Sequence, residues 1–171
     1  TEGTSPSPNG LGYARIPGLF NDAQVRGWKL VTDAVHAKGG RIFVQLMHTG
    51  RVSHAANLPA GAEVLGPTAE ACPGEMYTDS QGMQPHSAPR AMTEADITRT
   101  VSEFVASAQF AVEAGFDGIE LNYDLESDLS PKNGTKEFAA IRRTAEKIGI
   151  AVSGGAGTQR GEVTAGWAGR T

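Results

Sequence analysis

The chain has 171 residues, a formal net charge of −4 at pH 7 and a hydrophobic fraction of 39%. These values suit one globular domain and argue against a wholly disordered chain. Its basic residues form no blocks, which argues against nucleic acid or an anionic membrane as a partner. No apolar run approaches the roughly 20 residues of a membrane span. We therefore expect neither a nucleic-acid nor a membrane partner.

Glycine and cysteine usage narrow the class further. Glycine accounts for 22 of the 171 residues, which indicates tight loops and close approach of the backbone to a ligand. Cys72 is the single cysteine, so an intramolecular disulfide and a Cys-rich zinc site are excluded. A reducing, cytoplasmic location is expected. His48 and His54 are six residues apart, which is not a usual metal-ligand spacing, and we predict no metal site.

Residues 1–51 predict a loop, a helix and a strand. The first 20 residues are rich in Gly, Pro and Ser, with a possible strand end at 1–4. Asn21 can cap a helix with Gln24 as its return partner, and Gly39-Gly40 would end that helix. Residues 41–46 (RIFVQL) then predict a buried strand. The apolar stripe predicted for the helix comprises Val25, Trp28, Val31 and Val35.

Residues 52–92 show no sustained period, and a loop of this length predicts a lid, an excursion or a partly mobile segment. Thr93 then begins the clearest helix, with Asp96 as capping partner and Gly115 at its end. Residues 116–121 (FDGIEL) predict a second strand, followed by a polar, turn-rich segment. The apolar stripe of the helix comprises Ile97, Val101, Phe104, Val105, Ala108, Ala111 and Val112.

The last third predicts a helix over 135–147 and a strand over 148–152 that runs into SGGAG, and then a weakly patterned tail. The alternation of helices and strands predicts an α/β fold with parallel strands and crossover helices. In such folds the ligand site lies at the carboxyl ends of the strands.

Three predicted strand ends carry candidate chemistry. Gln45 could both donate to and accept from a heterocycle edge, or simply face solvent. Glu120 could point into a barrel interior or pair with a base, but a structural carboxylate is the simpler interpretation. Gly154 and Gly155 could expose backbone amides to a phosphate, with Arg170 supplying a guanidinium, although such runs are also ordinary turns.

Two long stretches carry a family resemblance. GYARIPGLFNDAQVRGWKLVTDAVHAKGGRIFVQLMHTGRVSH and PRAMTEADITRTVSEFVASAQFAVEAGFDGIEL resemble the old yellow enzymes, a family of FMN-dependent ene-reductases. The similarity is strongest to the bacterial branch with pentaerythritol tetranitrate, morphinone and N-ethylmaleimide reductases. It implies an α/β fold built as an incomplete TIM barrel with a long lid-like loop. It also implies that residues 1–171 form a single partial flavin-oxidoreductase domain.

The resemblance also implies site residues. Gly3 is similar to a small residue whose backbone contacts the flavin, and Gln45 to the glutamine that hydrogen-bonds the flavin pyrimidine. Tyr13 matches a tyrosine of the substrate pocket, and Met47 stands where close relatives have Trp. The looser C-terminal match implies phosphate contacts from Gly154, Gly155, Gly169 and Arg170.

The match departs from the family after the second predicted strand. Family members carry His-x-x-His or His-x-x-Asn, a pair that holds the substrate carbonyl, and then a Tyr that gives a proton. Here Asn122 stands at the first His position, Leu125 at the second and Ser127 at the Tyr position. Asn122 is therefore the one polar candidate for that pair. Counterparts of several family strands are missing, and a full barrel needs about 200 residues or more.

Three functional hypotheses follow. The resemblance implies an oxidoreductase that passes hydride from NAD(P)H through FMN to an activated alkene, a nitro compound or a quinone-like substrate. The missing segments favour the alternative of a catalytically impaired or non-catalytic remnant that acts as a binding or interaction module. A generic phosphate-binding α/β domain would rest on SGGAG alone. An incomplete barrel would also leave parallel edges open for self-association.

Overall fold

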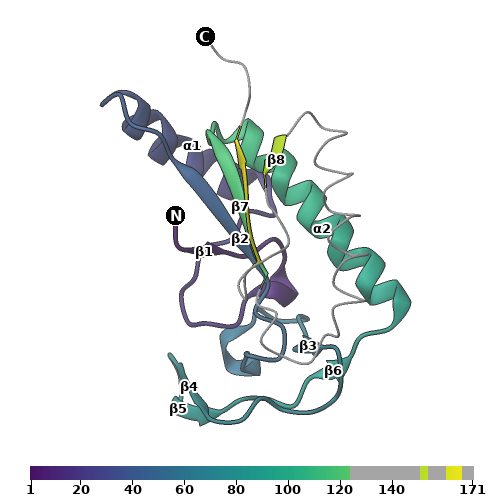
Figure 1. The fold of residues 1–171 in the computed structure, drawn as a ribbon. Coiled ribbons are helices and arrows are strands. Elements are labelled where there is room, and N and C mark those ends of the chain that lie inside the picture. The colour runs from purple at the N-terminus through teal and green to yellow at the C-terminus, as the bar shows by residue number, and fades with distance from the viewer. Residues whose placement is uncertain (124–150, 154–160, 167–171) are drawn as a thin grey trace.

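The main sheet has five strands in the order β1-β2-β7-β9-β8 (Figure 1). The computed structural model describes residues 1–123, 151–153 and 161–166. Within these residues β1 pairs with β2 and β2 with β7, all in parallel. The sheet does not close on itself in the described part of the chain, so the predicted incomplete α/β architecture is confirmed. The strands are β1 (Gly3–Thr4), β2 (Phe43–Met47), β7 (Gly118–Tyr123), β8 (Ala151–Ser153) and β9 (Gly161–Gly166).

Helix α1 (Asp22–His36) begins where the sequence predicts. The Asn21 side chain accepts a hydrogen bond from the backbone N–H of Gln24 at 3.0 Å, which satisfies an otherwise unpaired amide of the first turn. Val25 and Trp28 pack against the core as predicted. The prediction for Val31 is wrong, because it is 42% exposed. Thr32 lies buried beside it, and its hydroxyl donates to the carbonyl of Ala114.

Helix α2 (Glu94–Glu113) confirms the predicted capping box, since Thr93 and Asp96 each bind the other's backbone N–H. Arg90 and Arg99 also donate to the Asp96 carboxylate. These bonds, with those from Thr93, hold the pKa of Asp96 well below its usual range. The predicted stripe is wrong at Ile97, which is 37% exposed. Asp96 takes the buried position in that turn because its partners satisfy the carboxylate.

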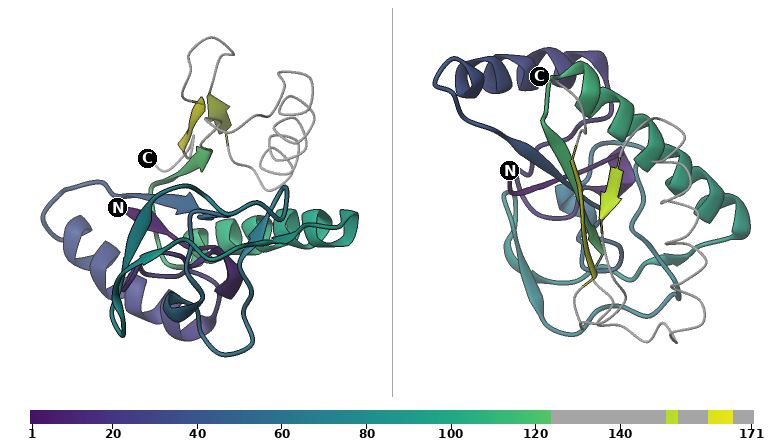
Figure 2. Two further views of the ribbon diagram at one scale, coloured as in Figure 1. Left: turned by 90° about the horizontal axis from the view of Figure 1, so that it is seen from below. Right: turned by 45° about the horizontal axis from the view of Figure 1, so that its top comes forward.

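The hydrophobic core lies between one face of the sheet and the two helices (Figure 2). Alternate residues of a strand point to opposite faces, so Val44 and Leu46 of β2 share one face and Gln45 and Met47 the other. Burying the first pair against the helices therefore leaves the second pair on the face away from them. The buried core residues are Leu19, Val44, Leu46, Ala111, Ala114, Phe116 and Ile119.

The two central strands begin two residues later than predicted, at Phe43 and Gly118. The Asp117 carboxylate accounts for this shift. It accepts hydrogen bonds from the backbone N–H of Ile42 and from Arg41, both at 2.8 Å, and lies 2.8 Å from His36 Nε2. The Asp117 side chain thus takes the place of a backbone carbonyl of the neighbouring strand as the hydrogen-bond partner of the Ile42 N–H. Burial raises the pKa of Asp117, but its hydrogen bonds outweigh that effect and hold the pKa at about 2.

Asp117 makes the acid stability of the fold testable. Its folded pKa lies below its ordinary value, so its contribution to the free energy of unfolding is present above about pH 4. That contribution is lost as the pH falls towards 2. We expect Asp117→Asn to be less stable at neutral pH and to lose less further stability between pH 4 and 2 than the unaltered chain. Urea unfolding followed by circular dichroism at several pH values measures both quantities.

The matched control is Asp33→Asn, on the exposed side of α1, where Asp33 pairs with Lys29. This variant keeps Asp117 and should retain the steep acid decline of the unaltered chain. Parallel acid declines in Asp117→Asn and the unaltered chain would contradict the prediction.

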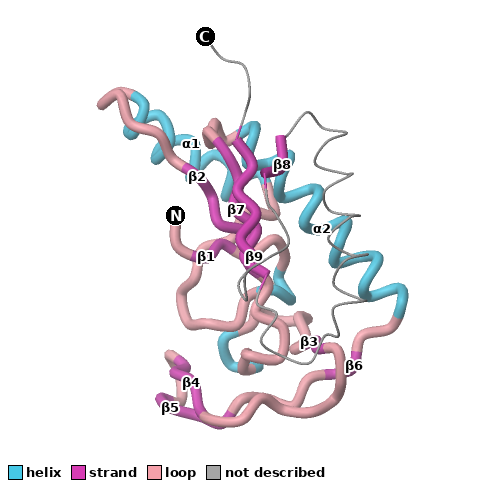
Figure 3. The backbone as a smooth tube through the Cα atoms, in the orientation of Figure 1, coloured by secondary structure: helices cyan, strands magenta, loops and turns pink. Residues whose placement is uncertain are grey.

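The segment between β2 and α2 is an excursion that contains short paired strands (Figure 3). At its base β3 (Leu65–Gly66) pairs in parallel with β6 (Arg90–Ala91). Further out, β4 (Glu75–Thr78) and β5 (Gly82–Pro85) form an antiparallel hairpin. The sequence analysis predicted a lid, an excursion or a partly mobile segment here, and the structure favours the excursion. Two 3₁₀ turns also occur, Pro8–Gly10 in the N-terminal loop and Ala55–Asn57 in the excursion.

The C-terminal part differs from the sequence prediction in one respect. The prediction of parallel strands throughout is wrong for β9, which runs antiparallel to both β7 and β8. It arises from the tail, where the sequence predicts no strand. The predicted strand over 148–152 corresponds to β8, which covers Ala151–Ser153. The predicted helix over 135–147 lies outside the described residues.

Candidate functional site

The candidate site is built on the face of the sheet opposite the helices. The strand register places Gly3 of β1 beside Gln45 of β2, and Gln45 beside Glu120 of β7. In-register neighbours in parallel strands point to the same side of the sheet. Three of the residues considered from the sequence, on segments far apart in the chain, therefore lie in one row.

Gly3 has no side chain of its own on this face of β1, and neighbouring side chains fill the space. A Cβ atom added at Gly3 would lie 2.5 Å from Met47 Cε and 3.5 Å from Gln45 Oε1. The position is buried, so the side chains of Met47 and Gln45 reach across it. The structure thus brings together Gly3, Gln45 and Met47, all of which the sequence analysis selected.

Gln45 and Glu120 are joined by a side-chain hydrogen bond. The amide nitrogen Nε2 of Gln45 donates to Oε1 of Glu120 at 2.8 Å, and both residues are half-buried. The sequence analysis considered each residue separately and did not predict this contact. The feature that explains this contact is the strand register, because each residue is the third of its own strand and the two strands pair in parallel.

The next row along the sheet pairs Met47 with Asn122. Met47 is the last residue of β2, and Asn122 is close to the end of β7. Both therefore lie at the carboxyl ends of their strands, where α/β folds place their ligands. The backbone of Asn122 thus stands one row beyond the Gln45–Glu120 pair.

Tyr13 lies on a loop that crosses the carboxyl end of β2. In that loop the carbonyl of Gly10 accepts a hydrogen bond from the backbone N–H of Thr49 at 3.2 Å, and Gly12 is in close contact with the Thr49 side chain. The Tyr13 ring is 43% exposed. The loop therefore reaches the site end of the sheet, and a pocket role for Tyr13 stays a prediction.

His48 follows directly after β2 and was selected only for its spacing in the sequence. Its Nδ1 accepts a hydrogen bond from the backbone N–H of Gly50 at 3.0 Å, so the neutral ring carries its proton on Nε2. Nε2 is buried and has no hydrogen-bond partner among the described residues. Burial lowers the pKa of His48 to about 4, so the ring is neutral at pH 7.

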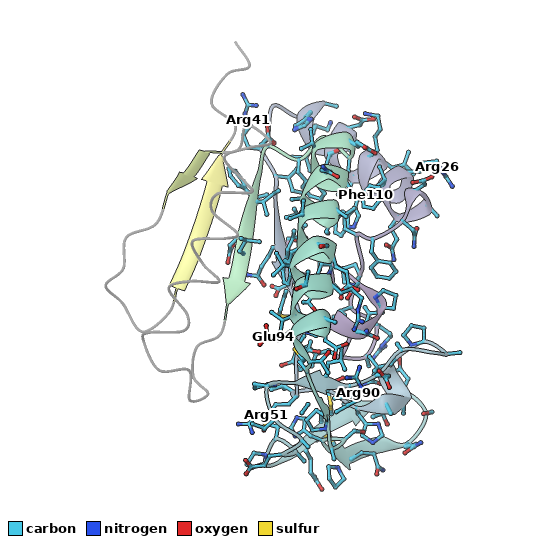
Figure 4. The ribbon with its side chains drawn as sticks, turned by 90° about the vertical axis from the view of Figure 1, so that its right-hand side faces the viewer. Arg26, Arg41, Arg51, Arg90, Glu94 and Phe110 are labelled. Carbon is cyan, nitrogen blue, oxygen red and sulfur yellow. The ribbon has the colours of Figure 1, made fainter. Side chains whose placement is uncertain are left out.

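The two ends of the sheet differ in what surrounds them (Figure 4). Arg41 lies at the end where β2 begins. Arg51, Arg90 and Glu94 lie together at the other end, where the excursion returns to α2 (Figure 4). The excursion therefore lies at the same end of the sheet to which Met47 and Asn122 belong (Figure 4).

Several of the predicted site residues cannot be located relative to this site. Gly154, Gly155, Gly169 and Arg170 lie outside the described residues, as do Leu125 and Ser127. In the part of the chain that the structure describes, no three His, Cys, Asp or Glu side chains gather in a way that could hold a metal ion. Neither of the two described helices is long and apolar enough to cross a membrane.

The chain is similar to known flavin oxidoreductases in sequence and in fold. The model of the NADH:flavin oxidoreductase / NADH oxidase family matches residues 1–124. 12-Oxophytodienoate reductase 7 of Oryza sativa subsp. japonica is 41% identical over 126 residues, which are 71% of this chain and 32% of that protein.

Two solved structures share the fold. Morphinone reductase matches with a TM-score of 0.74 and 33% identity, over 86% of this chain and 45% of that one. The old yellow enzyme homologue of Zymomonas mobilis matches with a TM-score of 0.75 and 30% identity, over 86% of this chain and 46% of that one. These neighbours are TIM barrels, so the predicted partial barrel is confirmed.

The chain spans about a third of the length of the curated relative and under half of each solved structure. A particular link to pentaerythritol tetranitrate or N-ethylmaleimide reductases stays a prediction. The family match over residues 1–124 covers strands β1 to β7, both helices and the row of site residues described above. The chain thus belongs to the NADH:flavin oxidoreductase / NADH oxidase family, the old yellow enzymes.

Proposed function

We propose that this chain binds FMN on the sheet face that carries Gly3 and Gln45, as part of an NAD(P)H-dependent oxidoreductase. The observation that carries the proposal is the row formed by Gly3, Gln45 and Glu120. The family match supports the choice of flavin.

The residues present fit the pyrimidine end of a flavin. A flat ring needs a stretch of backbone without side chains, and Gly3 would offer one on β1 once the flexible Met47 side chain that covers it moves aside. It also needs a group that can donate and accept at the ring's polar edge, and the Gln45 amide can do both. Met47 would add a polarisable side chain that can adapt to the bound ring.

When bound, FMN would supply the chemistry of taking a hydride from NAD(P)H and giving one to an activated alkene, a nitro compound or a quinone-like substrate. Gly154, Gly155, Gly169 and Arg170 are our proposed phosphate contacts. Asn122 would hold a substrate oxygen through its amide, and Tyr13 and Met47 would line the pocket. With Ser127 at the position of the family's tyrosine, we propose that water provides the proton to the substrate.

The experiment that tests this proposal is flavin quantification. The purified, desalted chain is supplied with excess FMN, separated from free ligand, and its visible absorbance is compared with its protein content. A flavin spectrum near one FMN per chain supports the proposal. No retained flavin, and no binding in an equilibrium titration, would overturn it.

A substitution of Gln45 tests the assigned contact. We expect Gln45→Leu to weaken FMN binding by about 10- to 100-fold, because the polar edge of the flavin would lose its hydrogen-bond partner in a partly buried site. Fluorescence titration of FMN measures the change in Kd. Gln109→Leu, at an exposed position of α2, is the matched control and should leave the Kd unchanged. Equal Kd values for Gln45→Leu and the control would remove Gln45 from the site.

A flavin-binding chain without catalysis is the second candidate. The observation in its favour is that Leu125 occupies the position where the family has a His or an Asn, and Ser127 the position where it has a Tyr. Adding NADPH to the FMN complex without oxygen separates the two candidates. Bleaching of the flavin absorbance, and its return when an enone is added, supports the oxidoreductase. A flavin that stays oxidised supports the binding module.

Three further proposals concern the domain, the cellular location and the self-association of the chain. We take residues 1–171 as a single partial barrel domain and place it in the cytoplasm, on the basis of the single Cys72. The described sheet ends in β1 and β8 without closing, so a second copy could pair with either edge. Sedimentation at several protein concentrations measures such self-association.

A further inference from the structure

The hydrogen bond between Gln45 and Glu120 links a proposed flavin contact to a residue of the same row that was given no contact with the flavin above. The two residues are register partners on neighbouring parallel strands, and the bond from Nε2 to Oε1 is 2.8 Å long. Both side chains are half-buried on the site face. The bond therefore belongs to the site and not to the core.

The chemistry of the two groups fixes which way the Gln45 amide faces. The nitrogen and oxygen of an amide have nearly the same shape, so hydrogen-bond partners determine its orientation. An ionised carboxylate only accepts hydrogen bonds. Glu120 therefore selects the NH₂ group of Gln45 and turns the amide oxygen away from β7.

The amide oxygen then lies on the side of β1. Gln45 Oε1 is 3.5 Å from the position that a Cβ atom on Gly3 would occupy. A ligand that displaces the Met47 side chain from above Gly3 would meet this acceptor, and could present an N–H donor to it. The imide N–H of a flavin pyrimidine is such a donor.

We propose that Glu120 is a positioning residue that fixes the orientation of the Gln45 amide and so makes Oε1 the atom that receives the flavin imide N–H. This inference rests on the proposed FMN site. Glu120 also strengthens the acceptor, since an N–H bonded to an anion leaves more electron density on the amide oxygen. A glutamine at position 120 has the same size but can donate as well as accept, so it no longer selects one orientation.

A double-mutant cycle tests this role. FMN Kd values are measured for the unaltered chain, Glu120→Gln, Gln45→Leu and the double variant. We expect Glu120→Gln to weaken binding about tenfold when Gln45 is present, and to have no further effect when position 45 is leucine. An equal effect in both backgrounds would show that Glu120 acts without Gln45 and would overturn the proposal, as would no effect in either.

Two further readouts separate positioning from structural support. Glu120→Gln should move the reduction potential of bound FMN to a more positive value, because it removes a negative charge near the ring. Glu70→Gln, an exposed loop variant, removes the same charge elsewhere and should leave both the potential and the Kd unchanged. Urea unfolding of the ligand-free Glu120→Gln chain should match that of the unaltered chain. A reduced stability together with an unchanged potential would assign Glu120 a structural role.

The ligand-free protein distinguishes this proposal from the proposed function. In its ¹⁵N–¹H spectrum, the side-chain NH₂ of Gln45 should show one proton displaced by the carboxylate, and Glu120→Gln should return it towards the other amide signals. An unaltered chain that shows this displacement but binds no FMN would overturn the FMN site while leaving the amide orientation in place. FMN binding without the displacement would overturn the positioning role alone.

Discussion

Replacing Phe116 with alanine is expected to lower the free energy of unfolding by about 3–5 kcal/mol. Phe116 is 3% exposed and belongs to the core between the sheet and the helices. Its ring centroid lies 5.3 Å from that of Trp28, at an interplanar angle of 59°, a tilted arrangement that adds to the gain from burial. Truncation would leave a cavity beside α1 and β7 that close-packed neighbours cannot fill. Urea unfolding, followed by circular dichroism, measures the loss.

Phe43→Ala is the matched control for this prediction. Phe43 is 37% exposed at the start of β2 and lies on the opposite face of the sheet, in line with Gln45. The same chemical change should cost about 1 kcal/mol or less there, because water already reaches the ring. Similar losses for the two variants would show that the face carrying Gln45 is packed as tightly as the core. That result would contradict its assignment as an open site.

Protonation of His48 is expected to destabilise the fold as the pH falls from about 6.5 to about 4. Burial lowers the folded pKa to about 4 from its ordinary value of 6.5, so the unfolded chain binds the extra proton first. A shift of this size corresponds to about 3 kcal/mol of stability, which is fully present above pH 6.5. A proton on Nδ1 would also point at the backbone N–H of Gly50, from which Nδ1 accepts a hydrogen bond in the neutral ring. NMR titration of the ring protons measures the pKa directly.

The stability measurement compares two phenylalanine variants. His48→Phe should flatten the decline in unfolding free energy between pH 6.5 and 4. His54 accepts a hydrogen bond from the N–H of Ala56 at 3.0 Å, in the same i to i+2 arrangement, which makes His54→Phe the control. Because the control retains His48, it should keep the decline. If His48→Phe does not fold, the NMR titration alone decides, and a pKa above 6 would contradict the prediction.

The helices show what the sequence predicts well. Caps act over three or four residues, so the Asn21 cap and the Thr93–Asp96 box could be identified from spacing alone, and both are confirmed. The prediction of Gln24 as the return partner of Asn21 is wrong, because the Gln24 side chain accepts from the backbone N–H of Phe20. Which residues face the core depends on partners distant in the chain. Thr32 is buried in place of Val31 because its hydroxyl reaches the carbonyl of Ala114. Apolar periodicity carries no information about such a partner.

The strands and the site show what the sequence predicts less well. The choice of Gly3 and Met47 rests on a family resemblance, and that of Gln45 on the resemblance and on its place at a predicted strand end. The register explains why the three residues meet. The bond from Gln45 to Glu120 could not be predicted, because it depends on which strands are neighbours and in which register. The short strands of the excursion were missed for another reason. Segments of two to four residues are too short for an alternating pattern to be recognised.

The β3–β6 pair has a consequence for how the excursion can change in length. Adjacent strands lie about 4.8 Å apart, so the pairing of Leu65 with Arg90 holds the two ends of the intervening chain together. The entropy of closing a loop grows only logarithmically, and each doubling of its length costs about 0.6 kcal/mol. The hairpin of β4 and β5 lies wholly within this closed loop. Insertions, deletions or grafted sequences there leave the ends in place, so the region around the site can diversify while β2 and β7 keep their register.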